Sequence, residues 1–345
     1  MKKEKINYAE ELSQIVAAIE IASPSALKFG GQTIPIGESA TSPASGLTQT
    51  SPLVTQLQNT LYQQGYCRRF SPQTYPLPAT AHFSADPSFV AQLAQANTSV
   101  ARWDAGWQVR RVENNGQIWA EKGGLIRTLW PGEYMNFSAP GSQIKKGDSL
   151  SIYVARESTT VQPGLYFSFG ETVMPSNHLD VVRFYWNLES SGAQPLMQRI
   201  TRDLNRFQVP FQFKCSIYLQ GYDRRDSAVL YIHKTYHAIV RQLISTWVEE
   251  CASALRDDVP LFALPVEKGV GLAEDPGTGE SFGMNRCRHI AEAIWTAHSS
   301  GVPRQTYLHE IQKHFHGHGL DPARLYLNPG STDHYSLWPA QAETR

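Results

Sequence analysis

The sequence has few cysteines, and none of them are paired at the spacing of a metal-binding or redox motif. No CxxC occurs, which argues against a cysteine zinc site. Each cysteine lies in an apolar or amphipathic stretch, which is typical of reduced thiols in the core of a cytoplasmic protein. The four are Cys67, Cys215, Cys251 and Cys287.

Long hydrophobic runs and an excess of one charge are also missing. No uncharged apolar run approaches the roughly 20 residues that a membrane span needs, and Glu10 and Glu11 interrupt any signal-peptide core. Lys and Arg together number 31, as do Asp and Glu, so the net charge of zero gives no reason to expect a nucleic acid or a membrane as partner. The apolar share of 41% is enough for a sizeable core and excludes global disorder.

Several common catalytic motifs are absent as well. His309-Glu310 begins like the HExxH zinc motif, but Lys313 stands where the second histidine is required. No GK[ST] phosphate loop, GxSxG elbow or Rossmann fingerprint occurs. We therefore expect neither a metal nor another cofactor. The histidines from which we expect no metal site are His309, His314, His316 and His318.

The first hundred residues, 1–100, are expected to form an N-terminal helical region. Apolar residues at helical spacing predict helices over residues 8–21 and 52–64. An Asp-Pro start predicts a short helix over 86–95. Residues 22–52 are rich in Ser, Thr, Pro and Gly and predict a long, mobile surface loop.

From Trp103 onwards the pattern changes to short β-type runs separated by turns, and later to strands that alternate with helices. We expect an α+β fold in which N-terminal helices precede a mostly antiparallel sheet packed with helices, with a catalytic domain over 101–345. Residues 267–283 are rich in Gly and Pro and predict a loop. The expected strands are 107–112, 117–121, 125–130, 149–154, 165–169, 181–188, 211–218 and 228–233. The expected helices lie near 196–207, 239–255, 284–298 and 304–315.

Three of these strands carry an unusual polar face. In residues 181–188 the apolar side chains alternate with Arg183, Tyr185 and Asn187. Lys214 is the only charge in its strand, and Tyr231 shares a face of the third strand with His233. A solvated sheet face would explain polar alternation, but charges isolated in apolar strands favour a pocket.

Two further segments add positive groups. Arg224 and Arg225 lie in the turn between the second and third of these strands, where a charged hairpin tip is the alternative interpretation. Ser281 precedes a helix that carries Arg286 and Arg288, an arrangement that suits an anion. Ordinary capping of the helix by Ser281 explains the same pattern.

Several motifs, in order along the chain, make it resemble the HopA-type family, which comprises a plant-pathogen type III effector and its bacterial relatives. The resemblance covers roughly residues 50–300, with its sharp motifs between 181 and 290. The motifs that carry it are Arg183-Phe184-Tyr185-Trp186-Asn187-Leu188, Val209-Pro210-Phe211-Gln212-Phe213-Lys214, Asp226-Ser227-Ala228-Val229-Leu230-Tyr231, Gly271-Leu272-Ala273-Glu274-Asp275-Pro276 and Gly279-Glu280-Ser281-Phe282-Gly283 with Arg286-Cys287-Arg288.

The resemblance implies a lyase that eliminates phosphate from phosphoserine or phosphothreonine in a ribosomal precursor peptide, giving dehydroalanine or dehydrobutyrine. Many relatives act in lanthipeptide-like peptide biosynthesis beside a kinase-like partner, so a phosphorylated precursor peptide and a kinase are the expected partners. Similarity to phosphothreonine lyases implies Lys214 as the base. Asn187 stands where those lyases have the acidic histidine, so Tyr231, His233 and Tyr185 are candidate substitutes.

The implied phosphate ligands are the cationic and hydroxyl groups named above: Arg183, Arg224, Arg225, Ser281, Arg286 and Arg288. Elimination needs a neutral base and cations that hold the phosphate, whose charge is about −1.5 to −2 at neutral pH. The alternative is a non-catalytic module, or an effector-type interaction protein, that binds a phosphorylated or acidic partner through the same arginines. A hydrolytic phosphatase is a third candidate, but no recognised nucleophile motif supports it.

Overall fold

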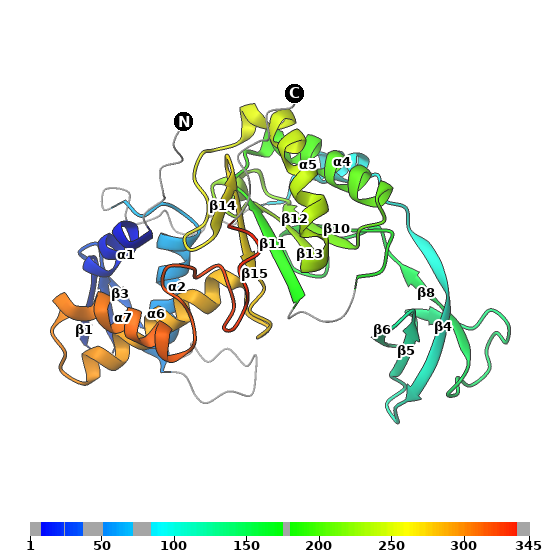
Figure 1. The fold of residues 1–345 in the computed structure, drawn as a ribbon, viewed down its shortest axis with the longest axis horizontal. Coiled ribbons are helices and arrows are strands. Elements are labelled where there is room, and N and C mark those ends of the chain that lie inside the picture. The colour runs from blue at the N-terminus through cyan, green and yellow to red at the C-terminus, as the bar shows by residue number, and fades with distance from the viewer. Residues whose placement is uncertain (1–7, 24, 37–50, 72–83, 175–179, 337–345) are drawn as a thin grey trace.

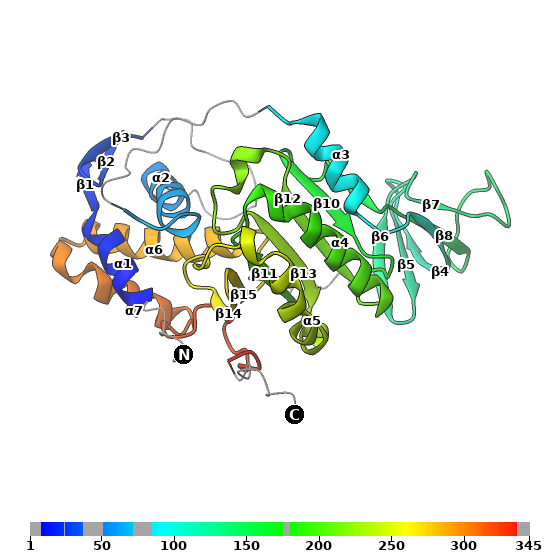
Figure 2. The ribbon, with the colours of Figure 1, turned by 90° about the horizontal axis from the view of Figure 1, so that it is seen from above.

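In the computed structural model, the described residues are 8–23, 25–36, 51–71, 84–174 and 180–336. They form an elongated molecule with a large sheet in the middle and a smaller sheet at each end (Figure 1 and Figure 2). The expected mixed α+β fold is confirmed, because the described residues hold seven α-helices and three sheets whose paired strands are all antiparallel.

A small sheet follows the first helix where the sequence predicted a loop. Helix α1 (Tyr8–Ala17) ends before Ile19, the last apolar residue of its pattern, because Ile19 begins a strand. Leu27 and Phe29 are buried in the main core and anchor this sheet. The prediction of a loop over residues 22–52 is therefore wrong for its described part, and residues 37–50 lie outside the described residues. The strands are β1 (Ile19–Ser23), β2 (Ala26–Phe29) and β3 (Gln32–Pro35).

The other two helices of the N-terminal region follow their predictions. Helix α2 (Pro52–Leu61) has proline in its first turn and continues into a short π-helix, Tyr62–Tyr66. Helix α3 (Pro87–Ala96) begins at Asp86, whose carboxylate accepts backbone N–H groups of the first turn. The π-helix carries two tyrosines, Tyr62 and Tyr66, toward the central sheet.

The second sheet lies at the opposite end of the molecule from α1 and has a hydrophobic core of its own (Figure 1). Its strand order is β6-β5-β4-β8-β7. Asp104 is a buried charged residue of this sheet. Its carboxylate accepts hydrogen bonds from Trp107 Nε1 at 2.7 Å and from Lys122 Nζ at 2.9 Å. The strands are β4 (Arg102–Val112), β5 (Ile118–Lys122), β6 (Leu125–Leu129), β7 (Tyr134–Met135) and β8 (Ser149–Val154).

The central sheet has seven strands in the order β14-β15-β11-β13-β12-β10-β9. The sequence predicted four of them, β10, β11, β12 and β13, within two residues at each end. The strands are β9 (Glu157–Ser158), β10 (Leu165–Phe169), β11 (Val181–Trp186), β12 (Phe211–Ser216), β13 (Ala228–His233), β14 (Leu264–Glu267) and β15 (Val270–Glu274).

Strand β15 corrects the prediction of a loop over residues 267–283. All five of its residues are buried, and it pairs with β11 inside the sheet. Gly271 weakens the strand signal, but the packing requires a glycine there. A Cβ atom at Gly271 would lie only 2.9 Å from Ala263 Cβ and 3.0 Å from Val259 Cβ.

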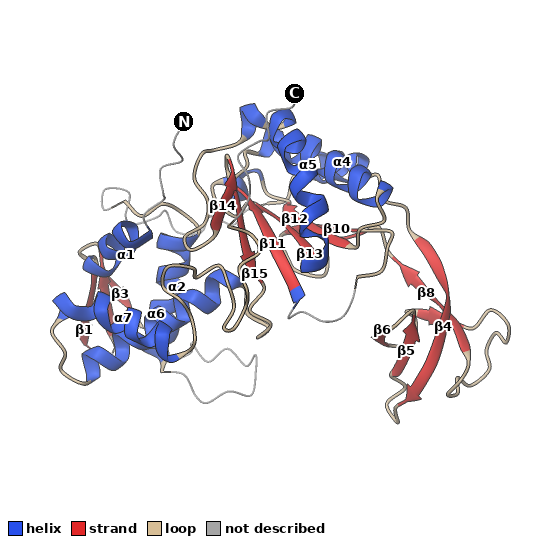
Figure 3. Cartoon of the chain, viewed as in Figure 1, coloured by secondary structure: helices blue, strands red, loops and turns tan. Residues whose placement is uncertain are grey.

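Helices cover one face of the central sheet and leave the other partly open (Figure 3). Helices α4 (Ser190–Arg206) and α5 (His237–Glu250) lie on the face of Phe184 and Trp186, and the Trp186 ring lies 6.4 Å from that of Trp247 on α5. Period two therefore turns the predicted polar side chains to the face opposite α4 and α5.

Helices α6 (Phe282–Ser299) and α7 (Tyr307–Gly317) pack against each other, and they meet α2 and α1 respectively (Figure 2). The main core accordingly joins residues from Leu12 to Tyr335. The domain boundary near residue 100 stays a prediction.

The prediction that the cysteines are unpaired thiols in the core is confirmed, because all four are free and buried. Burial raises the pKa of the Cys251 thiol to about 11, and that of Cys215 to about 12. Among the described helices, none is long and apolar enough to cross a bilayer.

Candidate functional site

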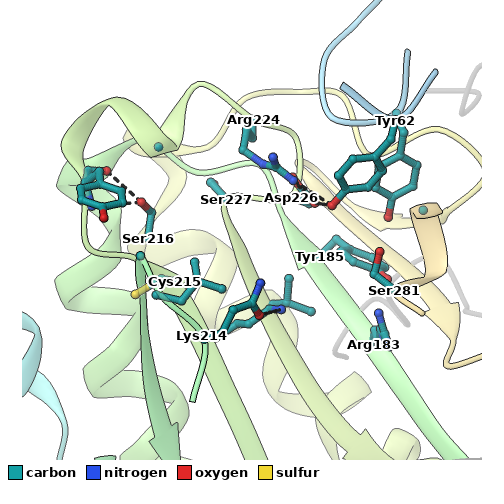
Figure 4. A pocket seen from close by; sticks show the side chains of 18 of the residues that line it. Tyr62, Arg183, Tyr185, Lys214, Cys215, Ser216, Arg224, Asp226, Ser227 and Ser281 are labelled. Atoms are coloured by element: carbon teal, nitrogen blue, oxygen red, sulfur yellow. Dashed lines mark hydrogen bonds and ion pairs between the residues drawn. The ribbon is translucent and has the colours of Figure 1, made fainter. Parts of the chain in front are cut away.

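A pocket of about 380 Å³ lies on the open face of the central sheet (Figure 4). Strands β11, β12 and β13 form its floor. The π-helix, the start of α6 and the loops before β10 and β13 form its walls. The structure brings together six of the residues expected from the sequence, and these line the pocket: Arg183, Tyr185, Lys214, Arg224, Tyr231 and Ser281.

The strand register explains how residues far apart in the sequence meet on this floor. Arg183 of β11 lies directly opposite Tyr231 of β13. Lys214 of β12 lies opposite Val229, two residues before Tyr231 on the same face. Directly opposed and diagonal side chains on one face are within reach of each other, so the three form one group.

Lys214 is half-buried and lies among aromatic rings. Its Nζ is 5.4 Å from the centre of the Tyr231 ring and 5.7 Å from that of Phe167. Its hydrogen-bond acceptor is Oε1 of Gln162, at 3.3 Å. Within the described part of the chain, no carboxylate lies within ion-pair distance of this amine.

Arg183 has a carboxylate on one side and the pocket on the other. Its Nε donates to Oδ2 of Asp275 at 2.8 Å, and its Nη2 donates to the same oxygen. Burial opposes the charge, but Tyr185, Tyr231 and Asp275 outweigh it and raise the pKa of Arg183. Arg183 also lines the pocket, so its guanidinium faces a ligand bound there.

Arg224 is arranged in the same way at the rim. Its Nε and Nη2 donate to the two carboxylate oxygens of Asp226 at 2.8 Å each, and Nη2 also lies 3.0 Å from the Tyr62 hydroxyl (Figure 4). Burial disfavours the charge, but Asp226 outweighs it and raises the pKa of Arg224. Both pocket arginines are therefore charged, and each is oriented by its own aspartate.

Two buried tyrosine hydroxyls in the pocket wall lack a hydrogen-bond partner among the described residues. They belong to Tyr66 and Tyr185, whose rings meet edge to face with centres 6.4 Å apart. Burial raises the pKa of both phenols, so both are protonated donors at neutral pH. An unpaired buried hydroxyl costs stability, which makes these groups natural contacts for a polar ligand.

Ser281 serves both of the roles considered from the sequence. Its Oγ accepts the backbone N–H of Met284 at 3.3 Å and so caps α6. Its position also lines the pocket beside Tyr185 (Figure 4).

Asn187 and Arg225 are not brought to the pocket. Asn187 is 2% exposed and donates through Nδ2 to both the backbone carbonyl and the carboxylate of Asp258. Arg225 is buried between Asp258 and Glu11, at 2.7 and 2.9 Å. Neither side chain lines the pocket. The geometry therefore does not support Asn187 as an acid or Arg225 as a phosphate ligand.

The two arginines of α6 also have structural partners. Arg286 is buried and donates to the backbone carbonyls of Leu325 and Leu327, which ties the C-terminal segment to the helix. Burial lowers the pKa of Arg286 to about 10. Arg288 pairs with Glu280 and Glu292. Neither arginine lines the pocket, so neither is part of the site we propose below.

His233, a candidate acid from the sequence, likewise lies outside the pocket lining. Its Nδ1 lies 2.8 Å from Thr235 Oγ1, and its Nε2 lies 3.8 Å from a carboxylate oxygen of Asp180.

Sequence reasoning missed Tyr62, Tyr66 and Gln162 as pocket residues. The tyrosines are four residues apart near the end of a helical pattern, a spacing that is equally typical of ordinary packing. Gln162 lies in a loop without any motif. Only the three-dimensional fold brings the π-helix over the sheet.

The fold and the pocket define a mixed α+β protein with a cationic, tyrosine-lined pocket on the face of its central sheet. Residues 156–327 of this chain match the model of the HopA1 effector protein family. The matched segment contains the whole central sheet and helices α4 to α7.

Two solved structures are similar to this chain. One is an effector protein from Pseudomonas syringae pv. tomato strain DC3000, with 15% identity, 80% of this chain and 94% of that chain covered, and a TM-score of 0.45. The other is an effector protein from Pseudomonas syringae pv. syringae strain 61, with 12% identity, coverage of 81% and 98%, and a TM-score of 0.40. No curated protein sequence matches the chain.

Proposed function

We propose that this protein is a lyase that eliminates phosphate from phosphoserine or phosphothreonine in a ribosomal precursor peptide. The observation that carries the proposal is Lys214, an amine without a carboxylate partner among the described residues, on the floor of a pocket that also holds Arg183 and Arg224. A base beside phosphate-binding cations is the minimum that this elimination requires.

The proposed reaction balances without an added reagent. The neutral amine of Lys214 takes the Cα proton, and that C–H electron pair becomes the Cα–Cβ double bond. The Cβ–O bond breaks, and its electrons leave with the phosphate oxygen. A phenol of the pocket, Tyr185 or Tyr231, donates a hydrogen bond or a proton to that oxygen. The products are dehydroalanine or dehydrobutyrine and inorganic phosphate.

In this proposal the two oriented arginines hold the phosphate. Arginine matches phosphate oxygens with paired N–H donors, and the aspartate on the opposite edge fixes the direction of each guanidinium. Asp275 does this for Arg183 and Asp226 for Arg224. Ser281, at the start of α6, adds a hydroxyl and the positive end of the helix dipole.

The proposed substrate carries a phosphate that another enzyme must add, so we infer that a kinase acts on the peptide first. We also infer that both steps occur in the cytoplasm, where the four buried thiols stay reduced. The kinase and the precursor peptide are the partners that this function requires.

The experiment is the incubation of the protein with a phosphothreonine peptide, followed by mass spectrometry. Elimination gives a product lighter by phosphoric acid that then reacts with an added thiol. Lys214→Ala and Lys214→Arg are both expected to be inactive, because arginine stays protonated. Lys313→Ala, which changes an exposed lysine of α7, is the matched control and keeps full activity. Turnover by Lys214→Ala at the wild-type rate would exclude Lys214 as the base.

A second candidate function is phosphopeptide binding without chemistry. Among the described residues, no histidine lines the pocket, so no imidazole is there to act as the acid. This favours binding, because a binder needs no acid. A binder returns the phosphopeptide unchanged, and its affinity would fall in Arg183→Ala and Arg224→Ala. The same incubation therefore separates the two functions.

A further inference from the structure

Three histidines converge between α6 and α7 in a cluster that does not line the pocket, and the Glu292 carboxylate lies beside two of them. We propose that this cluster binds a zinc ion through His289, His314 and His318, with Glu292 as the fourth ligand. The inference stands on its own geometry and does not depend on the proposed lyase activity.

The distances between the potential ligand atoms suit a single small ion. One nitrogen from each of the three imidazoles lies within 4.8 Å of the others. Nδ1 of His289 and Nε2 of His314 lie 3.2 Å apart. Two ligands of a tetrahedral zinc ion, each about 2.0–2.1 Å from the metal, lie about 3.3–3.4 Å apart. This pair is therefore already at the spacing that zinc requires.

Glu292 faces the same two nitrogens. Its Oε2 lies 3.5 Å from Nε2 of His314 and 4.0 Å from Nδ1 of His289, so the three atoms form a compact triangle. Its other oxygen, Oε1, accepts a hydrogen bond from Arg288 Nη1 at 2.8 Å. A hydrogen bond to the distal oxygen of a carboxylate is a common way to orient a metal ligand.

Helical spacing explains why these side chains share one place. His289 and Glu292 are three residues apart on α6, and His314 and His318 are four apart at the end of α7, so each pair shares a helix face. The Nδ1–H of His318 donates to the His314 carbonyl oxygen at 2.8 Å, which fixes the orientation of its ring. The sequence could not reveal the set, because His289 lies on a different helix from the other histidines.

The nitrogen ligands favour zinc or a related transition metal over magnesium and calcium. Imidazole suits zinc and its neighbours among the transition metals, whereas magnesium and calcium prefer oxygen ligands. His289 is buried and His318 is exposed, so an ion has a route from solvent to the buried end of the cluster.

The site would tie α7 to α6 and take no part in chemistry at the pocket. His289 is eight residues along α6 from Ser281 at the pocket, which is about 12 Å at the rise of an α-helix. Because α6 carries Ser281 and Gly283 into the pocket wall, a zinc ion here would fix the helix that supplies that wall.

The test measures zinc binding by the full chain after its tag has been removed and a chelator has stripped any bound metal. Titration calorimetry with zinc chloride gives the affinity and stoichiometry, and the visible spectrum of the cobalt form gives the coordination geometry. The wild type is expected to bind one zinc ion, to show the absorption of tetrahedral cobalt, and to melt at a higher temperature with zinc than without. His314→Ala and the exposed-site variant His318→Ala are expected to weaken binding by at least about tenfold, as losses around zinc sites do. His316→Ala, which changes an exposed histidine of the same helix, is the matched control.

Three results would overturn the proposal. The first is that the wild type takes up no zinc at stoichiometric concentration. The second is that His316→Ala loses as much affinity as His318→Ala, which would indicate non-specific histidine binding. The third is that magnesium competes with zinc at equal concentration, which would contradict a nitrogen-based site.

Discussion

Arg183 and Tyr231 face each other across β11 and β13, and the guanidinium carbon of Arg183 lies 5.2 Å from the centre of the Tyr231 ring. The amine of Lys214 approaches the same ring at 5.4 Å. One aromatic ring therefore lies between the proposed phosphate ligand and the proposed base. A cation at this distance from a ring centre is attracted by its negative face, so the ring positions the guanidinium of Arg183 on the pocket floor beside the amine of Lys214.

The first prediction separates the ring of Tyr231 from its hydroxyl. Tyr231→Phe keeps the ring, so Arg183 and Lys214 keep their positions and phosphopeptide affinity stays close to that of the wild type. If the hydroxyl assists the leaving phosphate, kcat for elimination falls by about 10²–10⁴-fold. Kinetics with a phosphothreonine peptide measure both parameters.

The control for that experiment is Tyr185→Phe, which removes the other candidate donor. A large loss in one variant and a small loss in the other identifies the group that assists the leaving oxygen. Wild-type kcat in both variants would exclude each phenol as a donor.

The second prediction concerns Asn187. Because its amide donates to the carbonyl and the carboxylate of Asp258, Asn187→Ala should cost about 1–3 kcal/mol of unfolding free energy, the range for a buried polar group left unpaired. Per folded molecule, elimination should proceed at the wild-type rate. Urea denaturation measures the first quantity and peptide kinetics the second. A reduced rate in a fully folded variant would contradict this prediction and indicate that Asn187 takes part in the reaction.

The example of Asn187 shows where sequence reasoning succeeds and where it stops. Alternation with period two placed Arg183 and Tyr185 on one face of their strand and Lys214 on the non-core face of the next, and the structure brings these three to the pocket together with Tyr231. Strand β11 ends at Trp186, so alternation no longer fixes the direction of Asn187.

Local patterns also failed to predict the partners of the arginines on α6 and the presence of strand β15. Helical position alone could not show that Arg286 binds the carbonyls of Leu325 and Leu327, because those partners arrive from a distant segment. Strand β15 lies in a segment rich in Gly and Pro that a propensity argument assigns to a loop, and its burial comes from its neighbours in the sheet. Tertiary contacts decide in each case, and they are not local in the sequence.

The third prediction concerns how the stability of the five-stranded sheet depends on pH through Asp104. Burial tends to raise the pKa of Asp104, but hydrogen bonds from Arg102, Lys122 and Trp107 outweigh it, so the pKa lies below its usual value. A carboxyl with a lowered pKa stabilises the folded state above its unfolded pKa, and this contribution is lost as the pH falls. The stability of the wild type relative to Asp104→Asn should therefore shrink from about pH 5 to about pH 3.

Calorimetric melting of both proteins across that range measures the difference. A difference that does not change with pH would show that the charge of Asp104 contributes nothing to the sheet, and that its hydrogen bonds alone matter.

The fourth prediction contrasts two neighbouring arginines. Arg224 lines the pocket at its rim, whereas Arg225 is buried against Glu11 and Asp258 and does not line it. Arg224→Ala should weaken binding of a phosphopeptide far more than binding of its unphosphorylated form. Arg225→Ala should leave that preference intact and instead lower the unfolding free energy by about 1.5–3 kcal/mol, the range for hydrogen bonds to charged groups. We expect the lower range, and not that of a fully buried ion pair, because the Asp258 side chain is 34% exposed. Titration calorimetry with both peptides and urea denaturation of both variants complete the comparison. If Arg225→Ala loses phosphate selectivity while it remains folded, or if Arg224→Ala keeps it, the assignment of Arg224 as the phosphate ligand is wrong.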